Sequence, residues 1–114
     1  MRNEKFRDER IDYLFRAILT LESVDDCYAF FEDLCTIAEI QGMSRRLLAA
    51  KLLREDKVYN EIAAQTGLST ATISRVNRCL KYGSDGYLSA LEKLYRQDKH
   101  KCAGIRLFRA FTIA

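Results

Sequence analysis

The side chains best suited to contacting another molecule lie together, between Ser69 and Lys81. This stretch begins with Ser and Thr hydroxyls, continues with arginines, and contains no acid before Lys81. Hydroxyl and methyl groups can contact the edges of bases, and guanidinium and ammonium groups bind phosphate oxygens. Because a surface that meets a polyanion should lack carboxylates, these residue types favour recognition of nucleic acid.

The rest of the chain contains few residues or motifs that would support catalysis. There is one histidine, His100, and none of the four cysteines forms a C-x-x-C pair. No pocket motif of paired carboxylates and no glycine-rich phosphate loop is present. We therefore expect no enzymatic activity, no cofactor and no metal ion. A metal site built from His100, Cys102 and more distant cysteines is the alternative.

The cysteines are expected to be free thiols, because disulfide frameworks belong to short secreted chains. Cys27 and Cys35 are eight residues apart in a helical pattern and are predicted to line a core. Cys79 is interpreted as a small buried apolar residue, and a redox switch is the alternative.

Length and composition predict one domain. The chain has 114 residues, 48% of them hydrophobic. No run of 18 apolar residues could span a membrane, and the charged start lacks a secretory signal, so a cytoplasmic location is expected. We expect a helical domain over residues 1–100 and an apolar tail over residues 101–114. This tail could dock on the body, cover a partner subunit or promote aggregation.

Positive charge is concentrated in the middle of the chain. Residues 44–82 hold eight Lys or Arg and three acids, a net charge of +5, whereas the whole chain has +3. A basic segment of this kind is typical of a protein that binds the phosphate backbone. A solvated helix face that happens to be basic is the alternative.

Apolar spacing is helical throughout, and no strand-type alternation occurs, so an all-α fold with six helices is predicted. The helices are expected at residues 8–21, from Ser23 as N-cap, from the capping box that Thr36 opens to about residue 55, and at residues 59–66, 70–82 and 86–99. The side chains predicted to face inward outside the central motif include Phe15, Phe30, Phe31, Leu34, Ile40, Met43, Leu47, Leu48, Leu52, Leu53, Leu91, Leu94 and Tyr95.

Residues 59–78 read YNEIAAQTGLSTATISRVNR and carry the pattern of a helix-turn-helix, which extends to about residue 82. Ala63 is the small residue needed where the second helix crosses the first. Gly67, four residues later, accepts the positive φ that the turn needs. The apolar residues that bracket the crossing are Ile62, Leu68, Ile73 and Val76. An ordinary helical hairpin with a glycine turn is the alternative.

The second helix of this motif should read DNA in the major groove. Its first turn offers Thr70, Ala71 and Thr72 to base edges, while Arg78 and Lys81, farther along, suit phosphates. The predicted DNA-binding residues are Lys57, Asn60, Ser69, Thr70, Ala71, Thr72, Ser74, Arg75, Arg78 and Lys81.

The run TIAEIQGMSRRLLAAKLLREDKVYNEIAAQTGLSTATISRVNRCLKYGSDGY resembles the trp repressor superfamily, and within it the trp-repressor-like YerC/YecD group. The likeness covers residues 36–94, with weaker likeness back to Leu14, and excludes the tail after His100. This resemblance implies an intertwined homodimer of six-helix subunits. It also implies a near-palindromic operator, because the two recognition helices would enter successive major grooves.

The resemblance further implies a pocket for L-tryptophan between two arginines, matched here by Arg45 and Arg75, with Thr36 lining it. Two residues depart from the family pattern. Val76 replaces a glycine and could fill the indole site, and Cys79 replaces a serine that contacts the amino group of the ligand. Tryptophan is therefore disfavoured, while another small effector or none stays open. Without an effector, Arg45 and Arg75 would contact phosphates or carboxylates.

The residues and the resemblance together predict a sequence-specific DNA-binding transcriptional regulator of the repressor type. A helical protein-interaction module that keeps the helix-turn-helix shape without binding DNA is the alternative. Salt dependence would separate the two, because DNA binding weakens steeply with salt and an apolar protein interface does not.

Overall fold

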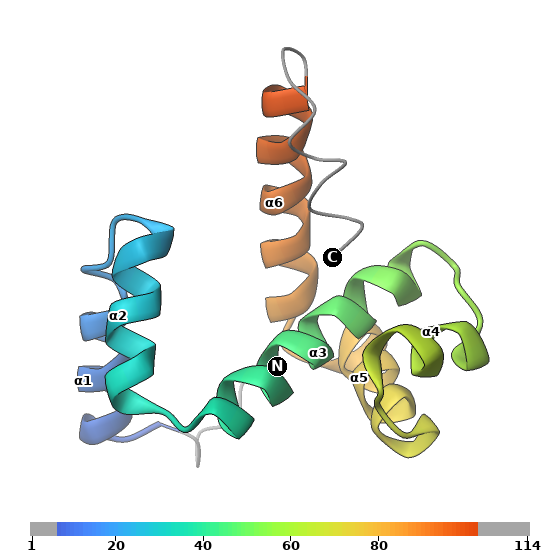
Figure 1. The fold of residues 1–114 in the computed structure, drawn as a ribbon, viewed down its shortest axis with the longest axis horizontal. Helices are drawn as coiled ribbons and strands as arrows, with labels where there is room; N and C mark the ends of the chain where they lie inside the picture. The colour runs from blue at the N-terminus through green and yellow to red at the C-terminus, as the bar shows by residue number, and fades with distance from the viewer. Residues whose placement is uncertain (1–6, 103–114) are drawn as a thin grey trace.

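The computed structural model describes residues 7–102, which form six α-helices and no strand (Figure 1). The apolar tail predicted from residue 101 therefore lies outside the described residues from residue 103 onward. The helices are α1 (Glu9–Ile18), α2 (Val24–Leu34), α3 (Ile37–Arg54), α4 (Tyr59–Thr66), α5 (Thr70–Tyr82) and α6 (Gly86–Cys102). These bounds confirm the all-α prediction, except that α1 is shorter and α6 longer than expected.

Side-chain caps explain why most of these helices begin where they do. Asp8 opens α1 by accepting a hydrogen bond from the Ile11 N–H, and Ser23 opens α2 in the same way. At the start of α3, Thr36 Oγ1 accepts from the Glu39 N–H at 3.1 Å, and Glu39 Oε1 accepts from the Thr36 N–H at 2.8 Å. This reciprocal pair is the predicted capping box, which satisfies two N–H groups that a helix end would otherwise leave unpaired.

The end of α3 is a Schellman turn built on an aspartate. Asp56 adopts a left-handed φ of 62°, and the N–H of Lys57 donates to the Leu52 carbonyl at 3.1 Å. The N–H of Asp56 donates to the Leu53 carbonyl at 3.0 Å, so the carbonyls of Leu52 and Leu53 near the end of α3 are satisfied. This turn reverses the chain and brings α4 back onto α3.

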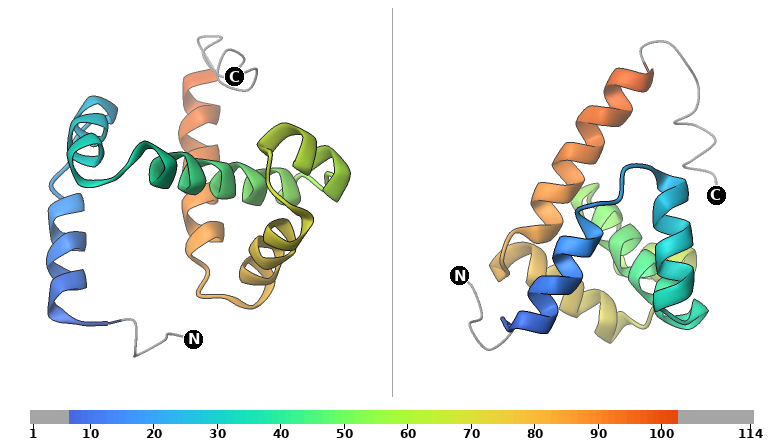
Figure 2. Two further views of the ribbon diagram at one scale, coloured as in Figure 1. Left: turned by 60° about the horizontal axis from the view of Figure 1, so that its bottom comes forward. Right: turned by 90° about the vertical axis from the view of Figure 1, so that its left-hand side faces the viewer.

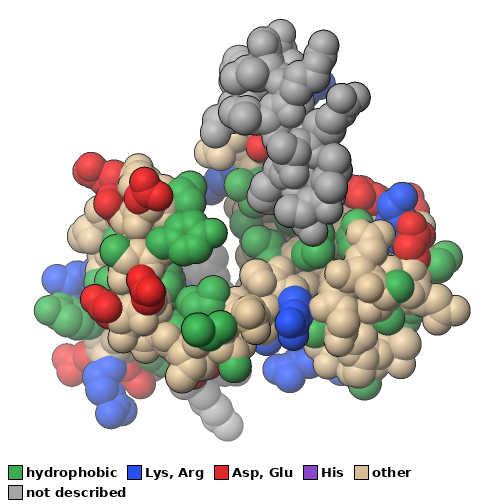
Figure 3. All heavy atoms as spheres, viewed as in Figure 1, with side chains coloured by type: hydrophobic (Ala, Val, Ile, Leu, Met, Phe, Trp, Pro, Cys, Tyr) green, Lys and Arg blue, Asp and Glu red, His purple; other side chains and the backbone are tan. Residues whose placement is uncertain are grey.

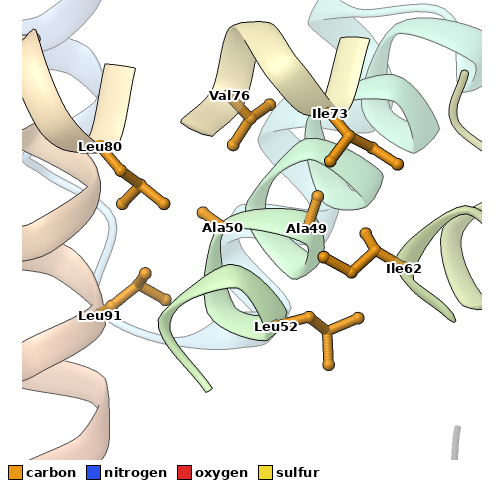
Figure 4. Close-up of a cluster of buried hydrophobic side chains, with 8 residues drawn as sticks. All are labelled: Ala49, Ala50, Leu52, Ile62, Ile73, Val76, Leu80 and Leu91. Atoms are coloured by element: carbon orange, nitrogen blue, oxygen red, sulfur yellow. The ribbon is translucent and has the colours of Figure 1, made fainter. Parts of the chain in front are cut away.

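One hydrophobic core joins α3, α4, α5 and the start of α6. Figure 4 shows its fully or nearly buried side chains, which converge from these four helices. The members are Ala49, Ala50, Leu52, Ile62, Ile73, Val76, Leu80 and Leu91. Ala49 and Ala50 are short, so α3 allows α4 and α5 to approach its backbone closely. We call the unit of α3, α4 and α5 the reading head.

The N-terminal helices α1 and α2 lie apart from this core. Neither packs closely on α3, α4, α5 or α6, and no residue of either helix is buried (Figure 2). Figure 3 shows acidic side chains on the outer side of this N-terminal part and hydrophobic ones on its flank toward α3 and α6. The predicted interior location of Cys27 is wrong for the single chain, since Cys27 is exposed and Cys35 is half-buried.

Several other inward-facing predictions are also wrong for the single chain. The exposed members are Phe15, Leu34, Met43, Leu47, Leu48, Leu94 and Tyr95. Their helices have apolar stripes, as predicted, but these side chains stay exposed in the single chain. Within the described residues, no helix is long and apolar enough to cross a membrane.

Candidate nucleic-acid interface

The helix-turn-helix spans α4 and α5, and Gly67 makes its turn. Gly67 has a φ of 76° and its N–H donates to the Ala63 carbonyl at 2.9 Å, so it is the left-handed C-cap of α4 as predicted. An added Cβ at Gly67 would meet nothing within 4 Å. Glycine is therefore needed for its backbone conformation and not for space.

Thr66 holds this turn together from inside, a role that sequence reasoning missed. Its side chain is buried, at 5% exposure. Its Oγ1 donates to the Ile62 carbonyl at 2.8 Å and accepts from the Leu68 N–H at 3.2 Å. One hydroxyl thus joins the last turn of α4 to the residue that follows Gly67. The sequence feature that indicates this role of Thr66 is a threonine directly before the turn glycine, since Thr hydroxyls commonly bond the carbonyl four residues earlier.

Apolar contacts hold α5 on the two other helices of the reading head. Ile62 of α4 and Ile73 of α5 are fully buried, and both meet the core beside Ala49 of α3. Leu68, predicted to bracket the crossing, and Ala63, predicted as the small residue at the crossing itself, are half-buried against the same cluster. The predicted crossing is therefore present, and the recognition helix is fixed by contacts on its inner face.

The first turn of α5 is fixed by Ser69. Ser69 Oγ accepts from the Thr72 N–H at 3.2 Å and donates to Thr72 Oγ1 at 3.1 Å. Thr72 is half-buried, and its hydroxyl oxygen is engaged by this cap. Ser69 and Thr72 thus set the conformation in which the start of α5 is presented.

The outer face of α5 carries most of the residues of this helix that were predicted to bind DNA. Five residues on this face are exposed, and two at its margins are half-buried. The outward residues are Thr70, Ala71, Ser74, Arg75 and Arg78, and the margin residues are Thr72 and Asn77. Lys81 is exposed as well, whereas the inner positions Ile73, Val76 and Leu80 are buried.

The charges on this face are not neutralised by the fold. The ion pairs within the described residues are Arg10–Asp8, Lys51–Glu55 and Arg96–Glu92, so Arg75, Arg78 and Lys81 are in none of them. No acid lies in α5. An exposed row of uncompensated cations beside short hydroxyl and methyl side chains suits a polyanionic partner with readable edges.

The start of α4, where the helix-turn-helix begins, adds further groups of the kind that bind phosphate. Val58 is the N-cap and offers no side-chain acceptor, so the first N–H groups of α4 have no side-chain cap. Lys57 and Asn60, both predicted to contact DNA, are exposed beside this helix end. Backbone N–H groups at a helix start and an adjacent lysine are groups that bind phosphate.

The residues assigned to an effector pocket by resemblance have different environments. Val76 is 2% exposed within the core, whereas Arg45, Arg75 and Cys79 are exposed. The Thr36 hydroxyl is engaged in the capping box at the other end of α3. The interpretation of Cys79 as a buried residue is therefore wrong for the single chain. Cys27, Cys35 and Cys79 are free thiols, as expected.

Known proteins match this chain over most of its length. The family model described as Trp repressor protein matches residues 9–95. The uncharacterized protein YerC of Bacillus subtilis (strain 168) is 51% identical over 94 residues, which cover 82% of this chain and 90% of YerC.

Two solved structures agree with the fold. A TrpR-like protein from Eubacterium eligens has a TM-score of 0.77 and 53% identity, and the match covers 81% of this chain and 95% of that chain. A protein from Staphylococcus aureus described as a proposed Trp repressor has a TM-score of 0.78 and 48% identity, over 83% of this chain and 95% of that chain.

Proposed function

Since the chain belongs to the Trp repressor family, whose members are DNA-binding regulators and not enzymes, we propose that it represses transcription by binding a specific operator. The observation that carries this proposal is the outer face of α5, which is exposed, contains no acid and rests on a buried core. A surface with rigid support and unpaired cations is what sequence-specific DNA binding needs.

Position along α5 separates the proposed contacts to bases from those to phosphates. Thr70, Ala71 and Ser74 lie in the first turns and would meet base edges at the floor of the major groove. Arg78 lies eight residues after Thr70, which is roughly 12 Å along the helix at about 1.5 Å per residue. Because the major groove is about 12 Å wide, Arg78 and Lys81 would reach the phosphates at its wall.

We further propose that the operator-binding form is a homodimer, because α3 is apolar on two opposite sides. Leu47 and Ala49 are two residues apart, hence about 200° apart around a helix of about 3.6 residues per turn. Ala49 faces the core of the reading head, whereas Leu47 and Met43, one turn earlier, are exposed. A second copy, with the apolar stripes of its own α1 and α2, would cover this side and offer the symmetry that a near-palindromic site requires.

The dimer can be tested by the mass of the protein in solution. We expect twice the chain mass of 13.2 kDa for the unaltered protein. Leu47→Glu should shift the mass toward that of one chain, because it places a charge within the apolar side. Ala64→Glu adds the same charge at an exposed site of α4 and should leave the dimer intact. A single-chain mass for the unaltered protein at micromolar concentration would refute the dimer.

The function itself is tested by incubating the protein with fragmented genomic DNA and sequencing the bound fragments. We expect enrichment of a near-palindromic sequence, and an affinity for it that falls steeply between low and moderate salt. No enriched sequence, together with binding that does not depend on salt, would instead support a protein-interaction module. Reporter transcription in the presence and absence of the protein would then distinguish repression from activation.

A further inference from the structure

We infer that Val76 positions the recognition helix from within the core, and that this makes operator binding independent of any small-molecule effector. This inference rests on the proposed function of α5 as the DNA-reading helix. It concerns how α5 is held against α3, which no comparison with known proteins assigns.

The Val76 side chain packs between α5 and α3. It is 2% exposed, and Figure 4 shows it directed toward α3, where Ala50 lies opposite and Leu80 lies one turn farther along α5. Ala49 and Ala50 are fully buried and short, so α3 contributes little bulk at this level. The spacing of the two helices is therefore set by the α5 side chains. Val76 is branched at Cβ, which restricts its rotation and makes it a stiff spacer.

The contact that Val76 completes is closed and apolar. Among the described residues, no buried side-chain nitrogen or oxygen lacks a hydrogen-bond partner, so no buried polar side chain is left unpaired for a ligand to bind. The arginines assigned to a pocket, Arg45 and Arg75, are exposed, and so is Cys79. A ligand that entered between α3 and α5 would have to displace Val76 and forfeit its packing.

A recognition helix held in this way is already in its binding orientation. When the competent conformation of a protein is fully populated, a ligand that selects it has nothing to add to the affinity for DNA. We therefore expect the unliganded protein to bind its operator as tightly as the protein mixed with candidate effectors.

The first test uses the unaltered protein, unfolded in denaturant to release small molecules and then refolded. Its operator affinity should change by less than about twofold when tryptophan, or a mixture of all twenty amino acids, is added. A gain of tenfold or more with either addition would overturn effector independence. If the refolded, dimeric protein bound no DNA under any condition, the proposed function would fail and this inference with it.

The second test removes the valine side chain from α5 and then places it on α3. Val76→Ala should weaken operator binding about tenfold without changing its salt dependence, because the charges stay and only the position of α5 changes. The double variant A50V/V76A, which places the valine on α3, should recover most of the affinity. Val76→Ile, which keeps the branched Cβ, should stay close to the unaltered protein.

Leu91→Ala is the matched control, because Leu91 belongs to the same core but comes from α6. It should lower the melting temperature while leaving operator affinity within about twofold at temperatures where the protein is folded. Operator binding by folded Val76→Ala that equals that of the unaltered protein would overturn the role of Val76. So would an A50V/V76A variant that folds, as judged by circular dichroism, but binds no better than Val76→Ala.

Discussion

The recognition helix α5 ends where the carbonyl oxygen of Cys79 meets the backbone of Gly83. The Gly83 N–H donates to this carbonyl oxygen at 2.9 Å, and a Cβ added to Gly83 would stand only 2.4 Å from the same oxygen. Gly83 has an ordinary negative φ of −86°, so glycine is required there by space and not by conformation. The end of α5, and the direction in which α6 leaves it, depend on this close approach.

Gly83→Ala should therefore destabilise the protein by about 1–3 kcal/mol, as overpacking against a rigid backbone does. Gly86→Ala is the matched control, because a Cβ at Gly86 would meet nothing within 4 Å. Chemical denaturation of the two variants checks the difference. Equal stability of both variants would show that the backbone of Cys79 and Gly83 adjusts freely.

Gly67→Ala should destabilise the turn by about 1–2 kcal/mol, through the left-handed φ alone, because the space around Gly67 is open. Gly42→Ala offers the contrasting case within α3. Its Cβ would lie 3.4 Å from the end of the flexible Arg46 side chain, so the helix should gain up to about 1 kcal/mol. The melting temperatures of Gly67→Ala and Gly42→Ala should therefore shift in opposite directions. A loss at Gly42 would indicate a close contact there with a second copy.

Thr66→Val should cost about 1–3 kcal/mol, because it keeps the shape but removes the hydroxyl that the Leu68 N–H needs as acceptor. Thr66→Ser should retain most of the stability, since the oxygen stays. Urea titrations of the two variants provide the comparison. Similar midpoints for Thr66→Val and the unaltered protein would mean that water replaces the hydroxyl.

Thr36→Ala should lower stability by about 1 kcal/mol through loss of the capping box, with Thr36→Ser nearly neutral. Operator affinity should be unchanged in both variants, with or without tryptophan, because the hydroxyl serves the start of α3. A change in the response to tryptophan would place Thr36 in an effector pocket instead.

Arg78→Ala should weaken binding to all DNA sequences alike and reduce the salt slope by about one per protomer. Thr70→Ala should do the reverse, altering the preferred sequence while leaving the salt slope nearly unchanged. Titrations of an operator and an unrelated duplex at several salt concentrations measure both effects. Relaxed preference at a single base pair in Arg78→Ala would identify Arg78 as a base reader.

The helix ends and the helix-turn-helix could be predicted from the sequence because they depend on neighbouring residues. A cap such as Ser69 or Thr36 needs only the N–H groups of the next turn, and Gly67 needs only its own φ. The exposed face of α5 followed from the same local logic. Once Ile73 and Val76 were placed inward, helical periodicity put Ser74 and Arg78 outside.

Only the tertiary structure decided what covers each apolar stripe. Periodicity shows that Met43 and Leu47 share a side of α3 but does not say whether another element covers it, and in the single chain both side chains are exposed. Periodicity also could not show that Val76 closes the contact with α3 while Cys79, three residues later, is exposed. Burial is a property of two surfaces, and a sequence pattern describes only one of them.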